Sequence, residues 1–258
     1  MTKKIYLDYQ ATTPVAPHIL NKMMPYFSEN FGNPHSNNHE YGRNANEAVQ
    51  VARQEISNLI NAQNSEIIFT SGATESNNLA IKSIARNYFE KQCQIITCKT
   101  EHKCVLESCH ELEKEGFKVT YLDVDEDGLI NIQELENLLE KQKALVSIMS
   151  ANNEIGVLQP IKEIGELCKK YNSIFHSDVA QSIGTQKIDV LEMNIDALSI
   201  SAHKIYGPKG IGALYISNNI KNTLRPLMSG GGQEMNLRSG TLSPALCVGI
   251  GEACKDIS

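Results

Sequence analysis

The alternation of strand-like and helix-like segments constrains the fold of this chain more than any other feature. From about residue 66 onward, β-branched apolar runs alternate with stretches whose apolar residues recur three and four positions apart. This alternation predicts an α/β fold in which helices cover both faces of a mostly parallel sheet. The predicted strands are 66–70, 94–97, 118–122, 144–149, 173–176, 197–200 and 212–216, and the predicted helices are 41–60, 76–90, 105–115, 132–141, 161–171 and 244–257.

Charge and composition restrict the class of protein. The 258 residues carry a formal net charge of −6, so no positive field attracts nucleic acid or an anionic membrane surface. No apolar run is long enough to span a bilayer, and residues 1–8 lack the apolar core of a signal peptide. The 7 cysteines, an odd number without framework spacing, fit a reducing compartment. We therefore expect a globular cytoplasmic protein whose partners include neither nucleic acid nor a membrane.

A lysine at the end of one predicted strand is the strongest candidate for chemistry. Lys204 follows Ser201 and His203 and precedes a turn rich in glycine and proline. A lysine fixed in this way suits a Schiff base with an aldehyde cofactor, and the two preceding side chains suit a phosphate. The alternative is a solvated surface lysine, and Ser-x-His-Lys alone does not decide between the two.

Three further strand ends carry groups that would suit the same cofactor. The run 70–77 passes through a glycine turn into a helix, where free N–H groups and the hydroxyl of Thr74 suit a phosphate, unless the turn is an ordinary helix cap. Asp178 ends an apolar run and suits a protonated pyridine nitrogen, or else serves as a turn residue. His102 opens a helix and suits stacking on a flat ring, although a histidine there is more often a surface residue. Ligands bind at the carboxyl ends of parallel strands, so these groups would converge in one sheet.

Together these motifs resemble the cysteine desulfurases, and within the class-V aminotransferases they are most similar to the IscS/NifS branch. The resemblance runs from residue 4 to the end of the sequence, and it implies a pyridoxal 5′-phosphate (PLP) enzyme. The implied fold is the fold-type-I large domain, a three-layer α/β/α arrangement around a mostly parallel mixed sheet. The motifs that carry the resemblance are 6–14 (YLDYQATTP), 70–75 (TSGATE), 100–103 (TEHK), 152–156 (NNEIG), 176–178 (HSD), 201–204 (SAHK) and 238–241 (RSGT).

The resemblance implies a role for each matching residue. Lys204 would form the Schiff base and move protons, and His102 would stack on the ring and take part in acid–base steps. Asp178 would pair with the pyridine nitrogen, and Gln181 would bond the ring hydroxyl. The other implied contacts are the phosphate with Ala73, Thr74, Ser201 and His203, the substrate side of the cofactor with Asn153, and the phosphate of a neighbouring subunit with Thr241.

The implied reaction converts L-cysteine to L-alanine and leaves an enzyme persulfide, whose sulfur feeds iron–sulfur cluster assembly. The implied partners are an iron–sulfur scaffold or another sulfur acceptor, and a second copy of the chain in a homodimer. No metal is implied.

The resemblance also implies a missing part. Family members continue into a C-terminal small domain that carries the nucleophilic cysteine and the arginine for the substrate carboxylate. We therefore expect an N-terminal arm at 1–15 that would belong with that domain, and a PLP-binding large domain at 16–258. Apolar surface at Tyr6-Leu7 and at Val248/Ile250 would then be exposed or taken up by another contact. The alternative function is a non-catalytic remnant or binding module that holds PLP and has no desulfurase activity alone.

None of the seven cysteines has the setting of the family's nucleophile. Most fall in predicted helices, and the remaining two, Cys93 and Cys98, flank a predicted strand, so we expect structural roles for them. Cys104 is the least unlikely exception, because it follows His102 closely.

Two motifs resemble metal-binding sites, but the sequence around them does not support metal binding. Residues 123–134 match the EF-hand calcium loop, but the preceding residues alternate like a strand and no second loop pairs with it. The cluster of Cys98, His102, Cys104, Cys109 and His110 lacks the paired spacing of a zinc site. We expect a strand-to-helix connection in the first case and no metal site in the second.

Overall fold

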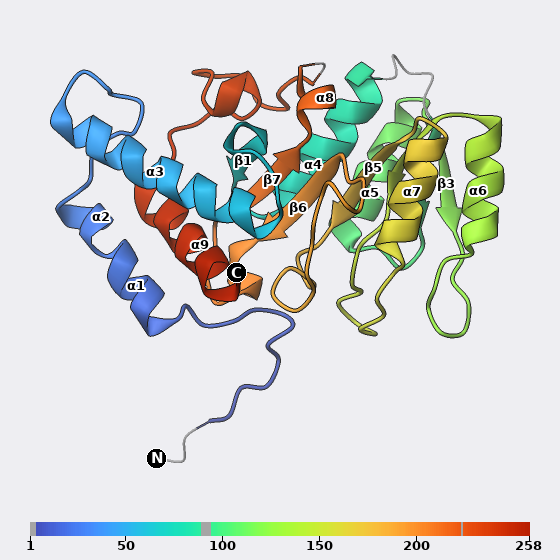
Figure 1. Ribbon diagram of the computed structural model, residues 1–258, viewed down its shortest axis with the longest axis horizontal. Coiled ribbons are helices and arrows are strands. Elements are labelled where there is room, and N and C mark those ends of the chain that lie inside the picture. Colours follow the sequence, from blue (N-terminus) through green and yellow to red (C-terminus); the bar gives the residue numbers. More distant parts are fainter. Residues whose placement is uncertain (1–3, 89–93, 223) are drawn as a thin grey trace.

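The computed structural model describes residues 4–88, 94–222 and 224–258 of the chain. A seven-stranded sheet forms its centre, and helices lie on both faces (Figure 1). The strands are β1 (Ile67–Thr70), β2 (Gln94–Cys98), β3 (Lys118–Leu122), β4 (Ala144–Ser147), β5 (Ile174–Asp178), β6 (Ala197–Ser201) and β7 (Gly212–Ile216). The helices are α1 (Pro17–Met23), α2 (Pro25–Ser28), α3 (Glu40–Leu59), α4 (Ala73–Ser83), α5 (Lys103–Lys114), α6 (Ile132–Lys141), α7 (Ile161–Lys170), α8 (Asn218–Lys221) and α9 (Pro244–Ile257).

The order of the strands places all the candidate motifs at one edge. The sheet runs β1-β7-β6-β5-β4-β2-β3, and β7 pairs antiparallel with both of its neighbours. All other pairs are parallel, so every strand except β7 points the same way. The carboxyl ends of β1, β6, β5, β4 and β2 therefore meet at one edge, as expected for converging strand ends.

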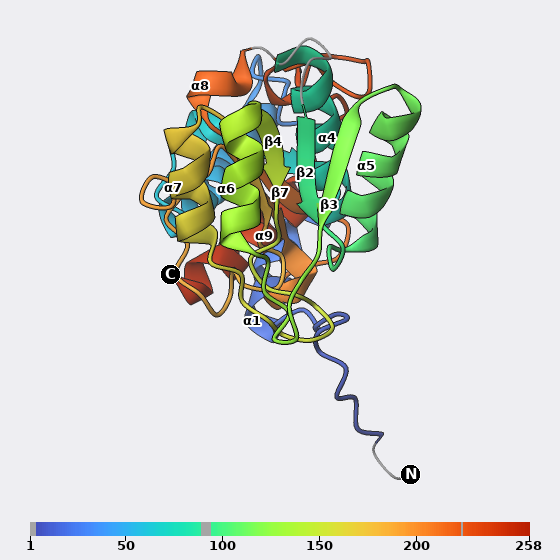
Figure 2. The same cartoon turned by 90° about the vertical axis from the view of Figure 1, so that its right-hand side faces the viewer.

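Alternating side chains divide the core into two layers. Ile95 and Leu145 face α4 and α5, whereas their neighbours Ile96 and Val146 face the opposite layer. That second layer contains α6 and α7 over one half of the sheet, and α3 and α9 over the other (Figures 1 and 2). Each strand of the centre is buried on both faces, which explains why the sequence shows continuous apolar runs there. The three-layer α/β/α prediction is confirmed.

The predicted elements are present, with differences at their ends. The predicted helix 76–90 begins earlier, at Ala73, and α4 ends at Ser83, where a π-helical turn, Ile84–Tyr88, continues it. The end of that prediction, Glu90, lies outside the described residues. Three short helices, α1, α2 and α8, were not predicted, because segments of 7, 4 and 4 residues are too short to show a helical period.

The connection from β3 to α6 is the segment that resembles a calcium loop. A strand, β3, enters it, and a bridge between Val124 and Ile130 closes its base. The carboxylate of Asp125 accepts hydrogen bonds from the backbone N–H groups of Asp127 and Leu129. The segment is therefore a strand-to-helix turn, as predicted, and its carboxylate is bonded to the backbone of its own turn.

A buried ion pair fastens the long connection between β7 and α9. Arg53 of α3 binds both carboxylate oxygens of Glu234 at 2.9 and 2.7 Å, and Glu234 also accepts from the N–H of Phe69 at 2.6 Å. Glu234, Met235 and Asn236 all have positive φ, between 46° and 64°. Non-glycine residues rarely adopt this conformation, so the ion pair holds a turn that would otherwise relax.

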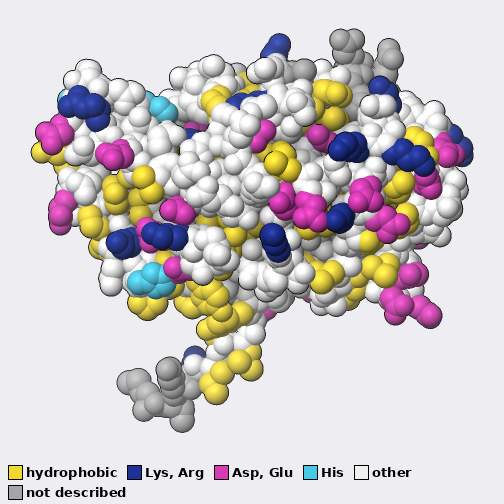
Figure 3. Space-filling view, viewed as in Figure 1, with side chains coloured by type: hydrophobic (Ala, Val, Ile, Leu, Met, Phe, Trp, Pro, Cys, Tyr) yellow, Lys and Arg dark blue, Asp and Glu magenta, His cyan; other side chains and the backbone are white. Residues whose placement is uncertain are grey.

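The N-terminal arm projects from the body of the molecule (Figure 1), and hydrophobic side chains lie along it (Figure 3). Tyr6 and Leu7 are 52% and 85% exposed, which confirms that part of the exposure prediction. Ile250 is fully buried, so its apolar surface is not exposed and is taken up by a contact within the chain. The reason is that α9 packs along α3, and Ile250 lies in the core between them.

A buried histidine in its neutral form lies in the middle of the sheet. His176 is fully buried, and its ring nitrogens contact the hydroxyls of Ser147 at 2.9 Å and Ser199 at 3.1 Å. These residues belong to three adjacent strands, so the imidazole links β4, β5 and β6. Burial lowers the pKa of His176 to about 3.

We predict that His176 makes the fold sensitive to acid. Its pKa is lower in the folded chain than in the unfolded chain, so its contribution to stability is complete above about pH 6.5 and is lost as pH falls toward 3. Between about pH 6.5 and 5, one such proton weakens folding by roughly 2 kcal/mol. In urea unfolding at pH 7.5 and pH 5, His176→Asn should lose less stability on acidification than the unmodified chain does. The exposed His110→Asn serves as the control, and an equal loss in all three proteins would contradict the prediction.

Candidate active site

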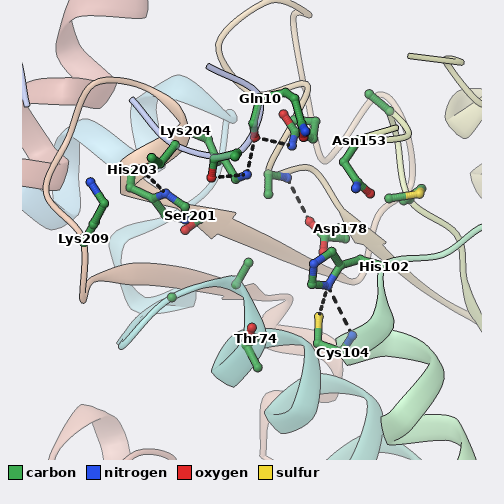
Figure 4. A pocket seen from close by; sticks show the side chains of 18 of the residues that line it. Gln10, Thr74, His102, Cys104, Asn153, Asp178, Ser201, His203, Lys204 and Lys209 are labelled. Carbon is green, nitrogen blue, oxygen red and sulfur yellow. Dashed lines mark hydrogen bonds between the residues drawn. The ribbon is translucent and has the colours of Figure 1, made fainter. Parts of the chain in front are cut away.

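A cleft of about 670 Å³ lies at the carboxyl edge of the sheet, and its walls come from five strand ends. All but one of the predicted site residues line it (Figure 4). The exception is Thr241, which is exposed on the connection before α9 and does not line the cleft of its own chain. The lining residues that the sequence predicted are Ala73, Thr74, His102, Asn153, Asp178, Gln181, Ser201, His203 and Lys204.

One end of the cleft is suited to an anion. Gly72 has a φ of 149° and a ψ of 178°, a conformation essentially limited to glycine, and this turns the chain from β1 into α4. No side chain caps α4, so the N–H groups of Ala73 and Thr74 open toward the cleft as free donors with the positive end of the helix dipole. Ser201 lies on the same side, because a Cβ on Gly72 would come within 3.9 Å of its hydroxyl.

Asp178 supplies a buried carboxylate to the same cleft. One oxygen accepts from the N–H of Ala180 at 2.9 Å, and the other accepts from the side-chain amide of Asn77 at 2.6 Å. Burial raises the pKa of Asp178, while these two hydrogen bonds and the nearby Lys204 work against that rise. A cationic group in the cleft would offset the free-energy cost of burying this carboxylate.

Lys204 is held by the N-terminal arm. Its ammonium donates to the carbonyls of Gln10 and Ala11, and Gln181 donates to the same Gln10 carbonyl at 3.1 Å (Figure 4). Burial lowers the pKa of Lys204, and Asp178 partly opposes this. Partial desolvation of this kind favours a neutral, nucleophilic amine.

The turn after Lys204 is clamped by one threonine. The hydroxyl of Thr13 donates to the carbonyl of His203 at 3.0 Å and accepts from the N–H of Tyr206 at 2.9 Å. Tyr206 has a φ of 62°, an unusual value for a bulky residue. His203 also contacts the hydroxyl of Thr12 at 3.0 Å through its Nδ1 atom. Residues 12–13 therefore hold the backbone on both sides of Lys204.

His102 reaches the cleft from the start of α5. It is exposed, and its Nδ1 atom accepts from the N–H of Cys104 at 3.2 Å and lies 3.0 Å from the sulfur of Cys104 (Figure 4). Asn153 lies on the opposite wall, and its amide donates to Glu154 at 2.7 Å. The ring of His102 is thus oriented by its own helix turn and available to the cleft.

Sequence reasoning missed residues that lie behind this wall. Asn77 bonds Asp178, and Glu101 accepts from the N–H of Met149 at 2.6 Å while its other oxygen has no partner among the described residues. Burial raises the pKa of Glu101 to about 8, and Asp178 adds to the effect. Both residues stand inside motifs that drew attention for other members, so proximity in the motif was the available signal.

A second ion pair ties the anion end of the cleft to the connection that carries Thr241. Arg238 binds Glu75 of α4 at 2.8 Å, and Glu75 also accepts from the N–H of Ser71 at 2.6 Å. Although burial opposes it, these hydrogen bonds lower the pKa of Glu75. Residues 71–75 are therefore linked to residues 238–241 by an ion pair.

The described cysteines lack the properties of a nucleophile. Five are buried, and Cys104 is half-buried. Burial raises the pKa of Cys98, Cys109, Cys247 and Cys254 to about 12 and that of Cys104 to about 11. The pKa of Cys168 is raised as well, again by burial. Cys93 lies outside the described residues. None of the six described thiols forms a thiolate readily near neutral pH.

Residues 4–88, 94–222 and 224–258 contain neither a metal-binding cluster nor a membrane-spanning helix. Among them, no group of three or more histidine, cysteine or acidic side chains is arranged to hold a metal ion. In the same ranges, no helix is long and apolar enough to cross a membrane.

Comparison with known proteins decides the family. The model of the class-V aminotransferase family matches residues 5–257. The chain is 56% identical over 254 residues to the mitochondrial cysteine desulfurase of Saccharomyces cerevisiae, which covers 98% of this chain. The chain belongs to the cysteine desulfurases of the class-V aminotransferase family. A further relative is the cysteine desulfurase IscS of Rickettsia massiliae, 54% identical over 99% of this chain.

Solved structures of this family have the same fold. A structure described as SspA in complex with cysteine superposes with a TM-score of 0.94 at 46% identity, over 98% of this chain and 73% of that one. A NifS-like protein gives 0.94 at 41% identity, over 99% of this chain and 70% of that one. The family uses PLP, and its substrate is cysteine.

The chain spans about half to three fifths of the length of these curated relatives. It covers 51% of the yeast protein and 62% of the Rickettsia protein. Because one relative is named as mitochondrial and the other is bacterial, family membership does not fix a compartment.

We predict that Thr13 clamps the lysine turn. Thr13→Val removes both hydrogen bonds of the hydroxyl with little change in shape, so the backbone amides of 12–16 and 204–207 should exchange hydrogen faster, by about tenfold for a loss near 1.4 kcal/mol. Hydrogen exchange followed by mass spectrometry measures this. Thr185→Val, whose hydroxyl bonds only within its own turn, should leave both segments unchanged. Equal protection in Thr13→Val and the unmodified chain would contradict the clamp.

Proposed function

We propose that this chain holds PLP in the cleft and supplies the cofactor half of a cysteine desulfurase. The observation that carries the proposal is the meeting of Lys204, Asp178 and the free start of α4 around one cleft. A phosphate needs donors, a protonated pyridine needs a carboxylate, and an aldehyde needs an amine. The cleft offers all three groups from three separate strand ends, and family membership supports the same assignment.

The residues of the chain divide the work of binding. Ala73, Thr74, Ser201 and His203 would hold the phosphate, and Asp178 would keep the pyridine nitrogen protonated. Gln181 would bond the ring hydroxyl once it leaves the Gln10 carbonyl, and Asn153 would lie at the substrate side. When bound, PLP supplies an electron sink for breaking bonds at the carbon next to the amino group of the substrate.

Lys204 and His102 would move the protons. The lowered pKa of Lys204 favours the neutral amine, which attaches the cofactor and later accepts a proton from the substrate. His102 lines the cleft and would hold a proton at one nitrogen of its imidazole. The carbonyls of Gln10 and Ala11, which accept hydrogen bonds from the Lys204 ammonium, would have to give up those contacts.

The whole reaction needs a second thiol. L-cysteine and an enzyme thiol would give L-alanine and an enzyme persulfide, in which the sulfur of the substrate leaves its carbon and bonds the sulfur of the enzyme. The raised thiol pKa values of the described cysteines argue that this nucleophile is not among them. This observation favours one alternative, a module that binds PLP and has no desulfurase activity alone.

The partners follow from the same assignment. Thr241 is exposed and does not line the cleft of its own chain, which supports a homodimer in which it reaches the neighbour's phosphate. A sulfur acceptor such as an iron–sulfur scaffold would take the persulfide sulfur. The free described cysteines suit a reducing compartment, and we place the chain in the cytoplasm.

We predict that PLP added to the purified chain gives a visible absorbance band that depends on Lys204. Lys204→Ala removes the only group proposed to bond the aldehyde, so the band should be lost. The exposed Lys187→Ala should keep it. A colourless unmodified chain, or an equal band in Lys204→Ala, would refute the cofactor assignment.

Turnover separates the two functions. The PLP-loaded chain is incubated with L-cysteine and dithiothreitol, and alanine and sulfide are measured. Because no described thiol is activated, we expect at most about one thousandth of the turnover typical of enzymes, whose median is about 10 per second. Turnover near that median by this chain alone would overturn the alternative of a PLP-binding module without desulfurase activity. It would also show that one of the seven cysteines of the chain serves as the nucleophile.

A further inference from the structure

A line of polar side chains runs behind the wall of the cleft and joins two of its proposed functional groups. Asn77 of α4 is fully buried, and its amide nitrogen donates to Asp178 at 2.6 Å and to the sulfur of Cys104 at 3.1 Å. The sulfur of Cys104 in turn lies 3.0 Å from Nδ1 of His102. The contacts therefore connect Asp178 to His102 through two residues that have no assigned role.

The orientation of the Asn77 amide favours the ionised form of Asp178. The amide oxygen of Asn77 is buried without a hydrogen-bond partner among the described residues, which costs about 1–3 kcal/mol. The opposite orientation would place that oxygen against a carboxylate oxygen at 2.6 Å, and the two acceptors would repel. An ionised Asp178 explains why the amide accepts this cost, because a charged acceptor strengthens the N–H donation.

The direction of donation continues to His102. The sulfur of Cys104 accepts from Asn77, so its S–H bond is available to donate to Nδ1 of His102. The thiol keeps its proton, because burial raises its pKa to about 11. The backbone N–H of Cys104 also donates to Nδ1, at 3.2 Å. With two donors on Nδ1, a neutral imidazole carries its proton on Nε2.

We propose that Asn77 and Cys104 are positioning residues, which keep Asp178 ionised toward the cleft and hold His102 as the Nε2–H tautomer. The consequence for the reaction rests on the proposed function. There, Asp178 must be an acceptor for the pyridine nitrogen, and His102 must present a defined proton at Nε2. The same two residues set both conditions, so the carboxylate for the pyridine nitrogen and the imidazole for the ring face are prepared together.

The tautomer is measured without the cofactor. In the chain labelled with ¹⁵N-histidine, long-range proton–nitrogen correlations distinguish the two tautomers, and His102→Gln identifies the His102 signals. We expect Nε2–H in the unmodified chain. Cys104→Ala removes a hydrogen bond worth about 1 kcal/mol, so the proportion of Nδ1–H should rise about fivefold, whereas Cys104→Ser restores a donor and should restore the ratio. An Nδ1–H tautomer in the unmodified chain, or an unchanged ratio in Cys104→Ala, would overturn the role of Cys104.

The charge of Asp178 is measured by carboxyl ¹³C NMR as a function of pH. The groups that face it are Glu101 and His102 at the start of α5, Cys104, and Lys204. Asn77→Ala removes a donor to the ionised form, so Asp178 should titrate at higher pH, with a tenfold change in its proton affinity for about 1.4 kcal/mol lost. Asn78→Ala is the matched control on the same helix, because its amide bonds only Thr74. Equal titration of Asp178 in all three chains would overturn the role of Asn77.

Cofactor affinity links the proposal to function. PLP should bind Asn77→Ala about tenfold more weakly than Asn78→Ala, since a larger fraction of Asp178 is then protonated and cannot pair with the pyridinium nitrogen. Circular dichroism confirms folding, and Asn77→Leu, which has no donor and leaves less empty space than alanine, replaces Asn77→Ala if that variant does not fold. If the unmodified chain fails to bind PLP, the proposed function fails, while the two NMR results still test the positioning roles.

Discussion

The common direction of the strands is the constraint on which the site depends. Five motifs far apart in the sequence meet because the strands that carry them end at one edge of the sheet. The single reversed strand, β7, does not disturb this, since its first residue rather than its last lies at that edge. Close approach is required there, because a Cβ on Gly212 would lie 2.6 Å from the Cα of Gly72. The fold thus brings the phosphate end, the lysine and the aspartate into one cleft.

Desolvation gives these groups their chemistry. Burial raises the pKa values of Asp178 and Glu101 and lowers that of Lys204, so each group is less stable in its charged form than it would be in water. The carboxylate and the ammonium lie at the same cleft and moderate each other. The carbonyls of Gln10 and Ala11 accept hydrogen bonds from the ammonium, so this half-buried lysine is paired within the chain. Binding of a charged cofactor would replace these contacts with stronger ones.

Ion pairs outside the cleft extend its order to the rest of the chain. Arg53 and Glu234 hold a turn with three consecutive positive φ values, and Arg238 and Glu75 connect that region to the start of α4. The connection that carries Thr241 is therefore linked to the anion end of the cleft, although Thr241 itself is exposed and does not line the cleft.

The sequence alone determined the layered fold, the strands and most of the site. Periodicity located the strands because their burial on both faces leaves continuous apolar runs, and strand-end motifs located Lys204, Asp178, Thr74 and His102. Short helices such as α1 and the true end of α4 depended on packing that leaves no period. Only the tertiary structure revealed the contacts of Asn77, Cys104 and Glu101, because these contacts join α4, α5 and β5 and depend on burial that no local pattern records. The sequence names the chemical groups, and folding decides which of them meet and in which protonation state.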